Sequence, residues 1–295
     1  MAQSQQSFRQ TPEFRAAMLV LKFFGVTLLA GIMFLPFIWM ICTAFKSSQE
    51  VQGAHFWPHI PQPDNLKIVL RMLPDPFTKL YLNLNIGKWV FNSVFVAAWV
   101  TTLQVVTSSM AAYSFSRINW KGRDKVFLLY LATMMIPGMI LTIPQFEIMV
   151  NLNLVNTYKG LIIPAAFSAF GTFMLRQFML GIPKSYDEAA EIDGAGHLQI
   201  FLDLILPLAK PGLLTLSIFT FLGNYNSLMW PLIMIKDDPL RTVPIGLLSF
   251  QGQYGTQIEL LMGATLICLI PLLIMFIAFQ KQLVRGINLA GGVKE

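Results

Sequence analysis

The chain has 295 residues, of which 55% are hydrophobic and only 12% are charged, and its mean hydropathy is +0.60. Soluble domains carry about twice that share of charged residues, so the composition excludes an ordinary soluble protein and indicates a chain that crosses a membrane several times. The formal net charge of +6 does not indicate a nucleic-acid partner. Much of the cationic excess lies in short segments beside apolar runs, where cations set orientation and meet lipid headgroups.

Metal and nucleotide chemistry find no support in the sequence. The two cysteines, Cys42 and Cys268, lie far apart inside apolar stretches, so they indicate neither a disulfide framework nor a metal site. The three histidines lie in connections, and neither a zinc-binding H-E-x-x-H motif nor a phosphate-binding G-x-x-x-x-G-K-[ST] loop occurs. We therefore expect no cofactor in this chain, no enzymatic activity of its own, and no nucleotide hydrolysis without a partner.

Six apolar runs follow one another along the chain, and each is long enough to cross the hydrocarbon core once as a helix. The runs are 23–45, 89–114, 126–146, 160–180, 212–235 and 260–279. The pattern predicts an all-α protein with six transmembrane helices in one domain, 1–295. Prolines lie within or near the spans, either as part of the packing or as hinges for gating. They are Pro36, Pro137, Pro144, Pro164, Pro231 and Pro271.

Basic residues decide the expected orientation. Arginine and lysine crowd the connection 117–125 and both tails, and short segments rich in these residues stay in the cytoplasm. Both termini are therefore expected there, with 1–22 as a cytoplasmic tail rather than a cleaved signal, because the apolar run that follows is too long for one. Six crossings then make 46–88 an external loop and 181–211 a cytoplasmic loop.

Charged side chains are almost absent from the six runs. The only one is Arg176, near the expected cytoplasmic end of the fourth run, where its side chain can reach the interface. Carriers driven by protons or ions usually hold a titratable or ion-binding group near the bilayer centre. The sequence therefore favours a transport process whose energy comes from elsewhere.

The 181–211 loop contains residues typical of helix starts and helix ends rather than the composition of a flexible linker. Ser185 and Glu188 have the spacing of a capping box, so a short helix is expected to begin at Tyr186. Two glycines then interrupt it, and a second apolar stretch, 198–206, leads into the fifth run. The pattern predicts helix, turn, helix at the membrane surface.

Small and acidic side chains share the first helix of this loop. Alanines would let another protein's surface approach closely, and the acidic side chains around them would form a negative patch. The alanines are Ala189, Ala190 and Ala195, and the acidic residues are Asp187, Glu188, Glu191 and Asp193. The residues alone leave two interpretations open: a docking helix that inserts into a partner's groove, or an interfacial helix that only joins two spans.

The segments Glu188-Ala189-Ala190, Asp193-Gly194-Ala195 and Leu206-Pro207 closely resemble the EAA loop of ABC importer permeases. Further matches extend the resemblance over nearly the whole chain, to the maltose-transporter-type carbohydrate permeases. They are Asn92-Ser93, the run from Ala111 to Arg117, and 286–294. The resemblance implies the type I ABC importer permease fold and a multi-pass protein of the bacterial inner membrane.

In that family the EAA loop sits in a cleft of a cytoplasmic ATPase and transmits its opening and closing. The resemblance implies this coupling role for Glu188, Ala189, Ala190, Asp193, Gly194 and Ala195. Glu188 is the candidate for an ion pair with the ATPase. The family's glycine-rich tail can also reach the ATPases, and the residues that match it are Gly291, Gly292, Val293 and Lys294, whereas Glu295 stands where a glycine is common. The implied partners are a homologous second permease, two ABC ATPases that bind ATP and magnesium, a periplasmic or lipid-anchored solute-binding protein, and membrane lipid.

A polar and aromatic cluster interrupts the fifth run. Sugars are bound by hydrogen bonds to their hydroxyl groups and by aromatic rings that stack on them, so this cluster is a candidate lining for a solute pathway. Its members are Asn224, Tyr225, Asn226 and Trp230. The other interpretation is that they bond neighbouring helices. Gln145 and Glu147, near the outer end of the third run, either face the cavity mouth or mark the membrane interface.

These features predict the permease subunit of a binding-protein-dependent ABC importer, which moves a sugar or oligosaccharide by alternating access driven by partner ATPases. Three alternatives remain: an ABC permease for a polyamine, phosphate or peptide, a secondary carrier, and an integral-membrane enzyme. A secondary carrier would take up solute with this chain alone and an ion gradient. An enzyme would show turnover in the isolated subunit.

Overall fold

The computed structural model describes residues 12–53, 55–74, 84–252 and 255–290. These residues are mostly helical, with one antiparallel pair of strands, β1 (Gln251–Gly252) and β2 (Gly255–Thr256), in which Gln251 lies opposite Thr256. They form two compact units, one made of the described residues up to 74 with Phe250–Leu266, the other of those from 84 to Ser249 with those from Ile267 onward. The predicted ATPase contact at 291–294 lies outside the described residues, as do residues 1–11 of the expected tail.

The first unit contains a long apolar helix and a braced loop. Its helices are α2 (Pro12–Ala44), α3 (Ser48–Val51), α4 (Asp64–Val69) and the start of α16 (Ile258–Ala290). The buried ammonium of Lys46 donates to the carbonyl of His55 at 2.5 Å, and the Asn65 amide donates to the carbonyls of Ala44 and Lys46 at 2.9 and 2.8 Å. These bonds satisfy backbone carbonyls where α2 ends, so the segment after α2 is folded onto that end.

Three helices form the core of the second unit: α5 (Ile86–Ser116), α9 (Ala169–Leu180) and α13 (Lys210–Tyr225). Glycines bring them close together. A side chain at Gly171 on α9 would meet the Ser108 hydroxyl of α5 at 2.7 Å, and one at Gly212 on α13 would meet the Phe178 ring of α9 at 2.7 Å. Small residues let helices approach closely inside membranes, so this bundle has the packing expected of membrane-spanning helices.

Shorter elements surround the bundle. They are α6 (Arg123–Ala132), η1 (Thr133–Met135), α7 (Gly138–Asn151), α8 (Tyr158–Ile162), α14 (Met229–Met234), η3 (Asp238–Leu240), α15 (Val243–Leu247) and η4 (Leu248–Phe250). The amide of the fully buried Asn92 on α5 donates to the carbonyls of Pro239 and Arg241 at 2.9 and 2.8 Å. It also accepts from the Tyr158 hydroxyl at 2.6 Å. Asn92 therefore ties both α8 and the segment around η3 to α5.

Three helices in the described part of the chain are long and apolar enough to cross a membrane by themselves. They are Met18–Ala44, Ile86–Ser116 and Ile258–Gln280. Two further pairs pass the same test together but are bent, by 97° between Arg123–Met135 and Gly138–Asn151 and by 75° between His197–Leu208 and Lys210–Tyr225. The helical class is therefore confirmed, with up to five crossings by this test, whereas the described residues do not form six uninterrupted helices.

Prolines accompany the breaks in the third and fourth apolar runs. Ile136 has an extended backbone, with φ −80° and ψ 118°, because the ring of Pro137 disfavours the helical conformation in the residue before it. In the fourth run α8 ends at Ile162, two residues before Pro164, and the Ser168 side chain caps the start of α9. The fifth run breaks between α13 and α14. Continuous helices over these three runs are thus an incorrect prediction.

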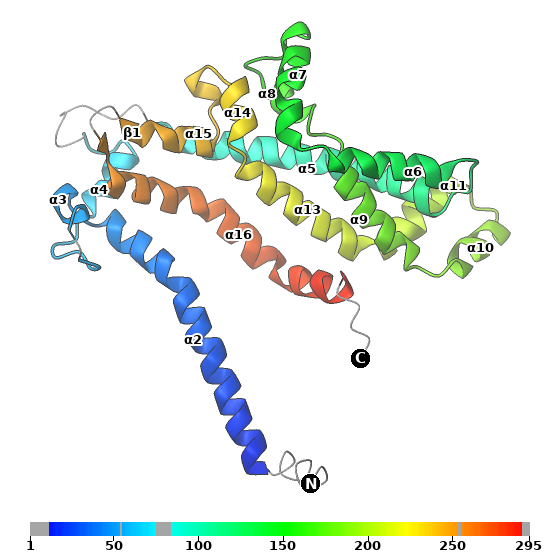
Figure 1. The fold of residues 1–295 in the computed structure, drawn as a ribbon, viewed down its shortest axis with the longest axis horizontal. Helices are drawn as coiled ribbons and strands as arrows, with labels where there is room; N and C mark the ends of the chain where they lie inside the picture. Colours follow the sequence, from blue (N-terminus) through cyan, green and yellow to red (C-terminus); the bar gives the residue numbers. More distant parts are fainter. Residues whose placement is uncertain (1–11, 54, 75–83, 253–254, 291–295) are drawn as a thin grey trace. The chain divides into compact units, whose positions relative to one another are not determined.

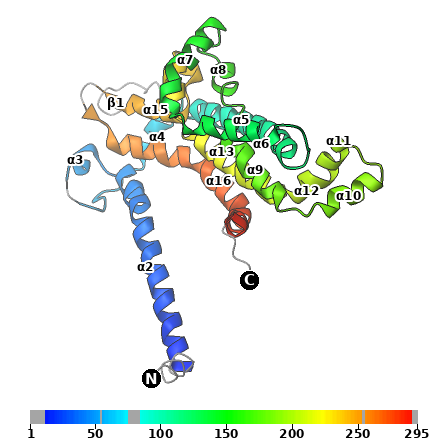
Figure 2. The same cartoon turned by 45° about the vertical axis from the view of Figure 1, so that its right-hand side comes forward.

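The 181–211 loop is helix, turn, helix, as predicted. Its elements are α10 (Ser185–Ile192), α11 (His197–Gln199), the π-helix η2 (Ile200–Ile205) and α12 (Leu206–Leu208). After α10, the amides of Gly194 and Ala195 donate to the carbonyls of Glu191 and Ala190 at 3.0 and 2.9 Å, and Gly194 has a φ of +85°. This is a Schellman motif, which needs a left-handed residue. Figures 1 and 2 show α10 and α11 beyond one end of the α5, α9 and α13 bundle.

The predicted capping box at Ser185 is wrong. Helix α10 begins one residue earlier than expected, and its N-cap is Lys184, which has a helical backbone and makes no side-chain cap. The amides of Asp187 and Glu188 donate to the carbonyl of Lys184 at 2.9 and 3.1 Å. Ser185 is therefore already the first helical residue, and a hydroxyl at that position does not cap the turn.

Candidate functional site

The six EAA-motif residues of the 181–211 loop divide between two faces. The exposed ones are Glu188, Ala189, Asp193 and Gly194. Ala190 and Ala195 are half-buried instead and pack against a buried apolar cluster. That cluster contains Ala112, Tyr113, Leu175, Met179, Ile200, Phe201, Ile205, Ala209 and Leu216. Ala190 and Ala195 therefore hold α10 to the bundle, and among the three alanines only Ala189 is presented outward.

Large apolar side chains are exposed on the same loop. Ile192 is 86% exposed, Leu198 is 70% exposed and Tyr186 is 49% exposed. A contiguous exposed apolar surface marks a place where another molecule docks, so these side chains are candidates for such a contact. The sequence interpretation rested on alanines and acidic residues and missed these side chains. The available signal was an apolar residue, Ile192, between the acidic Glu191 and Asp193.

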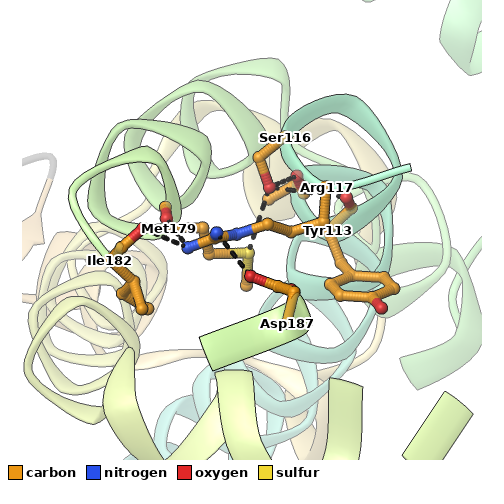
Figure 3. A network of polar contacts seen from close by, with 7 residues as sticks. Tyr113, Ser116, Arg117, Met179, Ile182 and Asp187 are labelled. Carbon is orange, nitrogen blue, oxygen red and sulfur yellow. Dashed lines mark hydrogen bonds and ion pairs between the residues drawn. The ribbon is translucent and has the colours of Figure 1, made fainter. Parts of the chain in front are cut away.

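Arg117 joins α10 to the bundle (Figure 3). It directly follows α5, and its side chain is only 4% exposed. Its Nη1 donates to Oδ2 of Asp187 at 2.7 Å, while its Nη2 donates to the carbonyls of Met179 and Ile182, the latter at 2.8 Å. Because the guanidinium is a rigid planar fork, one side chain fixes the end of α5, the end of α9 and the first turn of α10 to each other.

Asp187 departs from the expectation of an outward acidic patch. Its side chain is 16% exposed and points toward Arg117. A buried cation requires a counter-charge, and removing one member of such a pair leaves an uncompensated charge in a medium of low dielectric. The negative surface of α10 therefore consists of Glu188, Glu191 and Asp193, while Asp187 serves the contact with the bundle.

Arg176 forms a second clamp on the bundle. Its Nε donates to the carbonyl of Phe115 at 3.1 Å, and its guanidinium carbon lies 4.2 Å from the centre of the Phe127 ring. Its Nη2 lies 3.8 Å from the Asp124 carboxylate, and its side chain is 15% exposed. The protein thus holds this cation between α5, α6 and α9. None of these contacts involves α10, which distinguishes Arg176 from Arg117.

A cavity of about 370 Å³ opens in the second unit, where α7 and α8 face the break between α13 and α14. Two of the four predicted pathway residues, Asn224 and Trp230, line it. The Asn224 amide donates to the carbonyl of Thr220 at 2.8 Å, and the Trp230 indole donates to that of Gly160 at 3.1 Å. Trp230 therefore both bonds another segment and lines the cavity, whereas Asn224 lines the cavity and bonds its own helix.

The other two candidates for the solute pathway, Tyr225 and Asn226, are not part of the lining of this cavity. Tyr225 is 1% exposed, and its hydroxyl donates to the carbonyl of Cys268 at 2.6 Å. Asn226 is exposed, and its amide donates to the carbonyl of Leu222 at 3.0 Å. Successive residues of a helix point in different directions, so four neighbours at a helix end do not share one wall.

The opposite wall of the cavity comes from α7. Gln145, for which two interpretations were open, lines the cavity, whereas Glu147 is exposed and is not part of the lining. Thr142, Ser227 and Met229 also line it and were not singled out from the sequence. The sequence marks the bend before α7 only by a proline. It therefore gives no sign that residues of α7 lie close to residues of α14.

Both sites lie within a family match. Residues 104–288 match the model of the binding-protein-dependent transport system inner membrane component. The chain belongs to this family. The match confirms the resemblance drawn from the EAA motif, and it contains Arg117, the 181–211 loop and every cavity residue except Val96. The permease is accordingly a membrane-embedded, non-catalytic component of a transporter.

Curated relatives align with the permease over most of its length. It is 33% identical to the arabinooligosaccharides transport system permease protein AraQ of Halalkalibacterium halodurans, over 92% of this chain and 94% of that one. It is 35% identical to the trehalose/maltose transport system permease protein MalG of Thermococcus litoralis, over 93% and 96%. It is 34% identical to the sn-glycerol-3-phosphate transport system permease protein UgpE of Yersinia pestis, over 68% and 72%.

A solved structure shares the fold of the permease. The chain superposes with a TM-score of 0.74 on a chain of a bacterial ABC transporter involved in the import of the acidic polysaccharide alginate. The superposition covers 92% of the permease and 98% of that chain, at 22% sequence identity. This likeness shows that the permease has the fold of an ABC transporter membrane subunit.

Proposed function

We propose that the permease is the subunit of an ABC importer that translocates a carbohydrate by alternating access driven by partner ATPases. Two curated relatives are named for arabinooligosaccharides and for trehalose and maltose. The observation that carries the proposal is the extent of this similarity, which covers 92% and 93% of the chain and includes both the 181–211 loop and the cavity. In this proposal the permease couples ATP hydrolysis to transport and provides the solute pathway, but it catalyses no reaction.

Six crossings with both termini in the cytoplasm form the proposed topology. The bent pair Arg123–Met135 with Gly138–Asn151 counts as one crossing, α8 with α9 provides a second broken crossing, and α13 with α14 a third. Broken helices are tolerated at membrane depth where they line a cavity, and the breaks at 136–137 and 226–228 both adjoin the cavity. Both compact units then belong to one domain, 1–295, of the bacterial inner membrane, with 46–88 external and 181–211 cytoplasmic.

On the cytoplasmic side, the exposed face of α10 docks into a cleft of a partner ATPase. Ile192 and Leu198 supply apolar contact area, Ala189 permits close approach, and Glu188 pairs with a basic residue of the ATPase. Asp193 and Gly194 set the end of α10, where the chain turns into α11. The ATPases, not this chain, bind ATP and magnesium, and the tail residues 291–294 add a second contact to them.

Movement of α10 is transmitted to the spans through its inner face. Ala190 and Ala195 pack on the buried cluster, and Arg117 ties Asp187 to the ends of α5 and α9. ATP binding closes the two ATPases, draws together the 181–211 loops of this chain and of a homologous second permease, and opens the pathway toward a solute-binding protein outside. Hydrolysis returns the pathway to the inward-facing state.

The solute passes along the cavity wall. Asn224 and Trp230 contact it directly, because both line the cavity. Tyr225 supports that wall from behind through its bond to the carbonyl of Cys268. Asn226, which is exposed beside the break, contacts solute only where the second permease completes the pathway.

The deciding experiment is solute-stimulated ATP hydrolysis and uptake by the complete transporter in proteoliposomes. We expect stimulation by a neutral sugar or oligosaccharide in a panel that also contains amino acids, polyamines, peptides and phosphate. Stimulation by a non-sugar solute alone would overturn the carbohydrate assignment. Uptake by liposomes that contain only this chain and an ion gradient would overturn the ABC mechanism.

A second candidate solute is a phosphorylated polyol. It is favoured by the relative named for sn-glycerol-3-phosphate, although that match covers 68% of the chain rather than more than nine-tenths. Adding glycerol 3-phosphate to the panel separates the two candidates. Stimulation by it, without stimulation by any neutral sugar, would replace the first candidate with the second.

A further inference from the structure

We propose that the cavity is a subsite for an uncharged, hydroxyl-rich part of the solute, and that Gln145 and Ser227 determine its specificity. This inference rests on the proposed transport function. It goes beyond that function because it assigns the recognising groups and the charge class of the solute to particular residues of this chain. The observations that carry it are the position of the cavity, the free hydrogen-bonding groups in its wall and their electrical neutrality.

Two breaks in the helical bundle meet at this cavity. After the first, at 136–137, the beginning of α7 supplies Gly138, Met139, Thr142 and Gln145 to the lining. Around the second, at 226–228, the ends of α13 and α14 supply Asn224, Ser227, Met229 and Trp230. Transporters commonly bind solute where helices are discontinuous, because side chains and backbone groups then face a shared space.

Polar groups in this wall remain available for a ligand. Gln145 and Ser227 are half-buried, and neither side chain hydrogen-bonds to another described residue. The side-chain Nδ2 of Asn224 donates to the carbonyl of Thr220, so its side-chain Oδ1 stays free to accept. By contrast, the Tyr225 hydroxyl is occupied by the carbonyl of Cys268. A half-buried amide without a partner gains most from a ligand that both donates and accepts.

The chemistry of the wall matches neutral hydroxyl groups. Every polar group that lines it is an amide, a hydroxyl or an indole N–H, carried by Thr142, Gln145, Asn224, Ser227, Trp230 and Thr242. An amide can donate to one sugar hydroxyl and accept from the next, and flat apolar surfaces such as Trp230 suit the face of a sugar ring. A carboxylate or phosphate entering this space would lose water without meeting a charged partner, which is costly.

The test uses single cysteines in the complete transporter, because Cys42 and Cys268 are both buried. The variants are Gln145→Cys and Ser227→Cys, with Ile143→Cys as the control. Ile143 lies on the same helix, is 79% exposed and is not part of the lining, so in the proposed topology it faces lipid, which hydrophilic reagents do not enter. Each is treated with a neutral hydroxyethyl and an anionic sulfonatoethyl methanethiosulfonate, without nucleotide and with trapped ATP. Rates are divided by those with free cysteine in solution.

We expect both hydrophilic reagents to modify positions 145 and 227 in at least one nucleotide state, the neutral one faster, and neither to modify position 143. Modification should block uptake. No modification at 145 and 227 in either state, equal modification at 143, or an anionic reagent as fast as the neutral one would each overturn the inference. If complexes transport a neutral sugar but their cysteines are not modified, the subsite assignment is wrong while the proposed function still holds.

A second measurement does not depend on cysteine chemistry. We expect Gln145→Ala to raise the KM for uptake of the sugar that stimulates ATP hydrolysis by roughly three- to tenfold, the effect of one lost hydrogen bond. Gln145→Glu, which keeps the shape but adds a negative charge, should raise the KM at least as much. An unchanged KM in both variants would contradict the role of Gln145 even if the cysteines are labelled.

Discussion

The guanidinium of Arg117 lies 2.7 Å from the carboxylate of Asp187 and joins the end of α5 to the first turn of α10. We expect Arg117→Ala to lower the stability of the complete transporter by about 3–5 kcal/mol, because it leaves the largely buried carboxylate of Asp187, which is 16% exposed, without its partner. Asp187→Asn leaves the guanidinium bonded to two carbonyls and should cost less, about 1–3 kcal/mol. Melting temperatures of the purified complexes test this order.

The same pair should affect coupling. We expect Arg117→Ala and Asp187→Asn to reduce solute uptake per ATP hydrolysed, because α10 is no longer tied to the spans. Arg176→Ala is the control, since it removes a clamp on α5 and α6 that does not touch α10, so stability should fall while uptake per ATP stays constant. Equal loss of coupling in all three variants would show that the Arg117 pair has only a structural role.

Exchange of the two charges is not expected to restore coupling. In the double variant Arg117→Asp with Asp187→Arg, the carboxylate at 117 would face the carbonyls of Met179 and Ile182, which now accept from the guanidinium. Two acceptors cannot bond each other. Recovery of wild-type uptake in the double variant would mean that the ion pair matters alone and that the carbonyl contacts do not.

Gly194 is required for its backbone conformation. Its φ of +85° is unfavourable for a side chain, although a Cβ there would meet nothing within 4 Å. We expect Gly194→Val to cost about 1–2 kcal/mol and to displace α10 from its docking position, and Gly194→Asn to cost less. Gly196→Val is the control, because Gly196 has an extended backbone and equal space around it. ATPase stimulation and melting temperature should separate the two glycines.

The exposed face of α10 should govern affinity for the ATPase rather than folding. We expect Ile192→Glu to weaken ATPase binding by about 30-fold, the effect of losing a contact worth about 2 kcal/mol, and Glu188→Lys to weaken it through charge repulsion. Ser185→Ala should change neither binding nor stability, since Ser185 makes no cap. Titration of purified ATPase onto the permease measures all three. Normal affinity of Ile192→Glu would refute this docking face.

Local signals explain what the sequence could predict. Glycines and acidic residues within a few positions of each other determine where α10 ends and α11 begins, so helix, turn, helix was readable. Composition alone indicated a helical membrane protein. Arg117 and Asp187, however, are 70 residues apart, and neither segment carries a sequence signal that identifies the other as its partner. The Asp187 side chain was therefore assigned to the surface, although its partner turns it inward.

The cavity could be predicted only in part, for a related reason. Inside a membrane, helices are apolar on most faces, so periodicity does not tell which side of a span meets a neighbour. The predicted cluster of Asn224, Tyr225, Asn226 and Trp230 identified the right segment but not which of its members line the cavity. Gln145 joins Asn224 only because the chain bends by 97° before α7, and a proline indicates a possible bend without its angle.

Gly171 should be required for its size, because α9 and α5 approach closely there. A Cβ at this position would meet the Ser108 hydroxyl oxygen at 2.7 Å and Leu216 at 3.2 Å, so we expect Gly171→Ala to cost about 1–3 kcal/mol by overpacking. Gly223→Ala on α13 is the matched control. It has nothing within 4 Å, so alanine should be neutral or stabilise by about 0.5–1 kcal/mol.

Relief of the crowding separates size from other causes at this position. Ser108→Gly combined with Gly171→Ala restores the space on the α5 side, so we expect the double variant to melt at a higher temperature than Gly171→Ala alone. Ser108→Gly by itself should lower the melting temperature slightly, because glycine is less favourable within a helix. If the double variant instead melts at the temperature expected for the sum of the two single effects, the two positions are not coupled. Glycine at position 171 would then not be required by the close approach of α9 to α5.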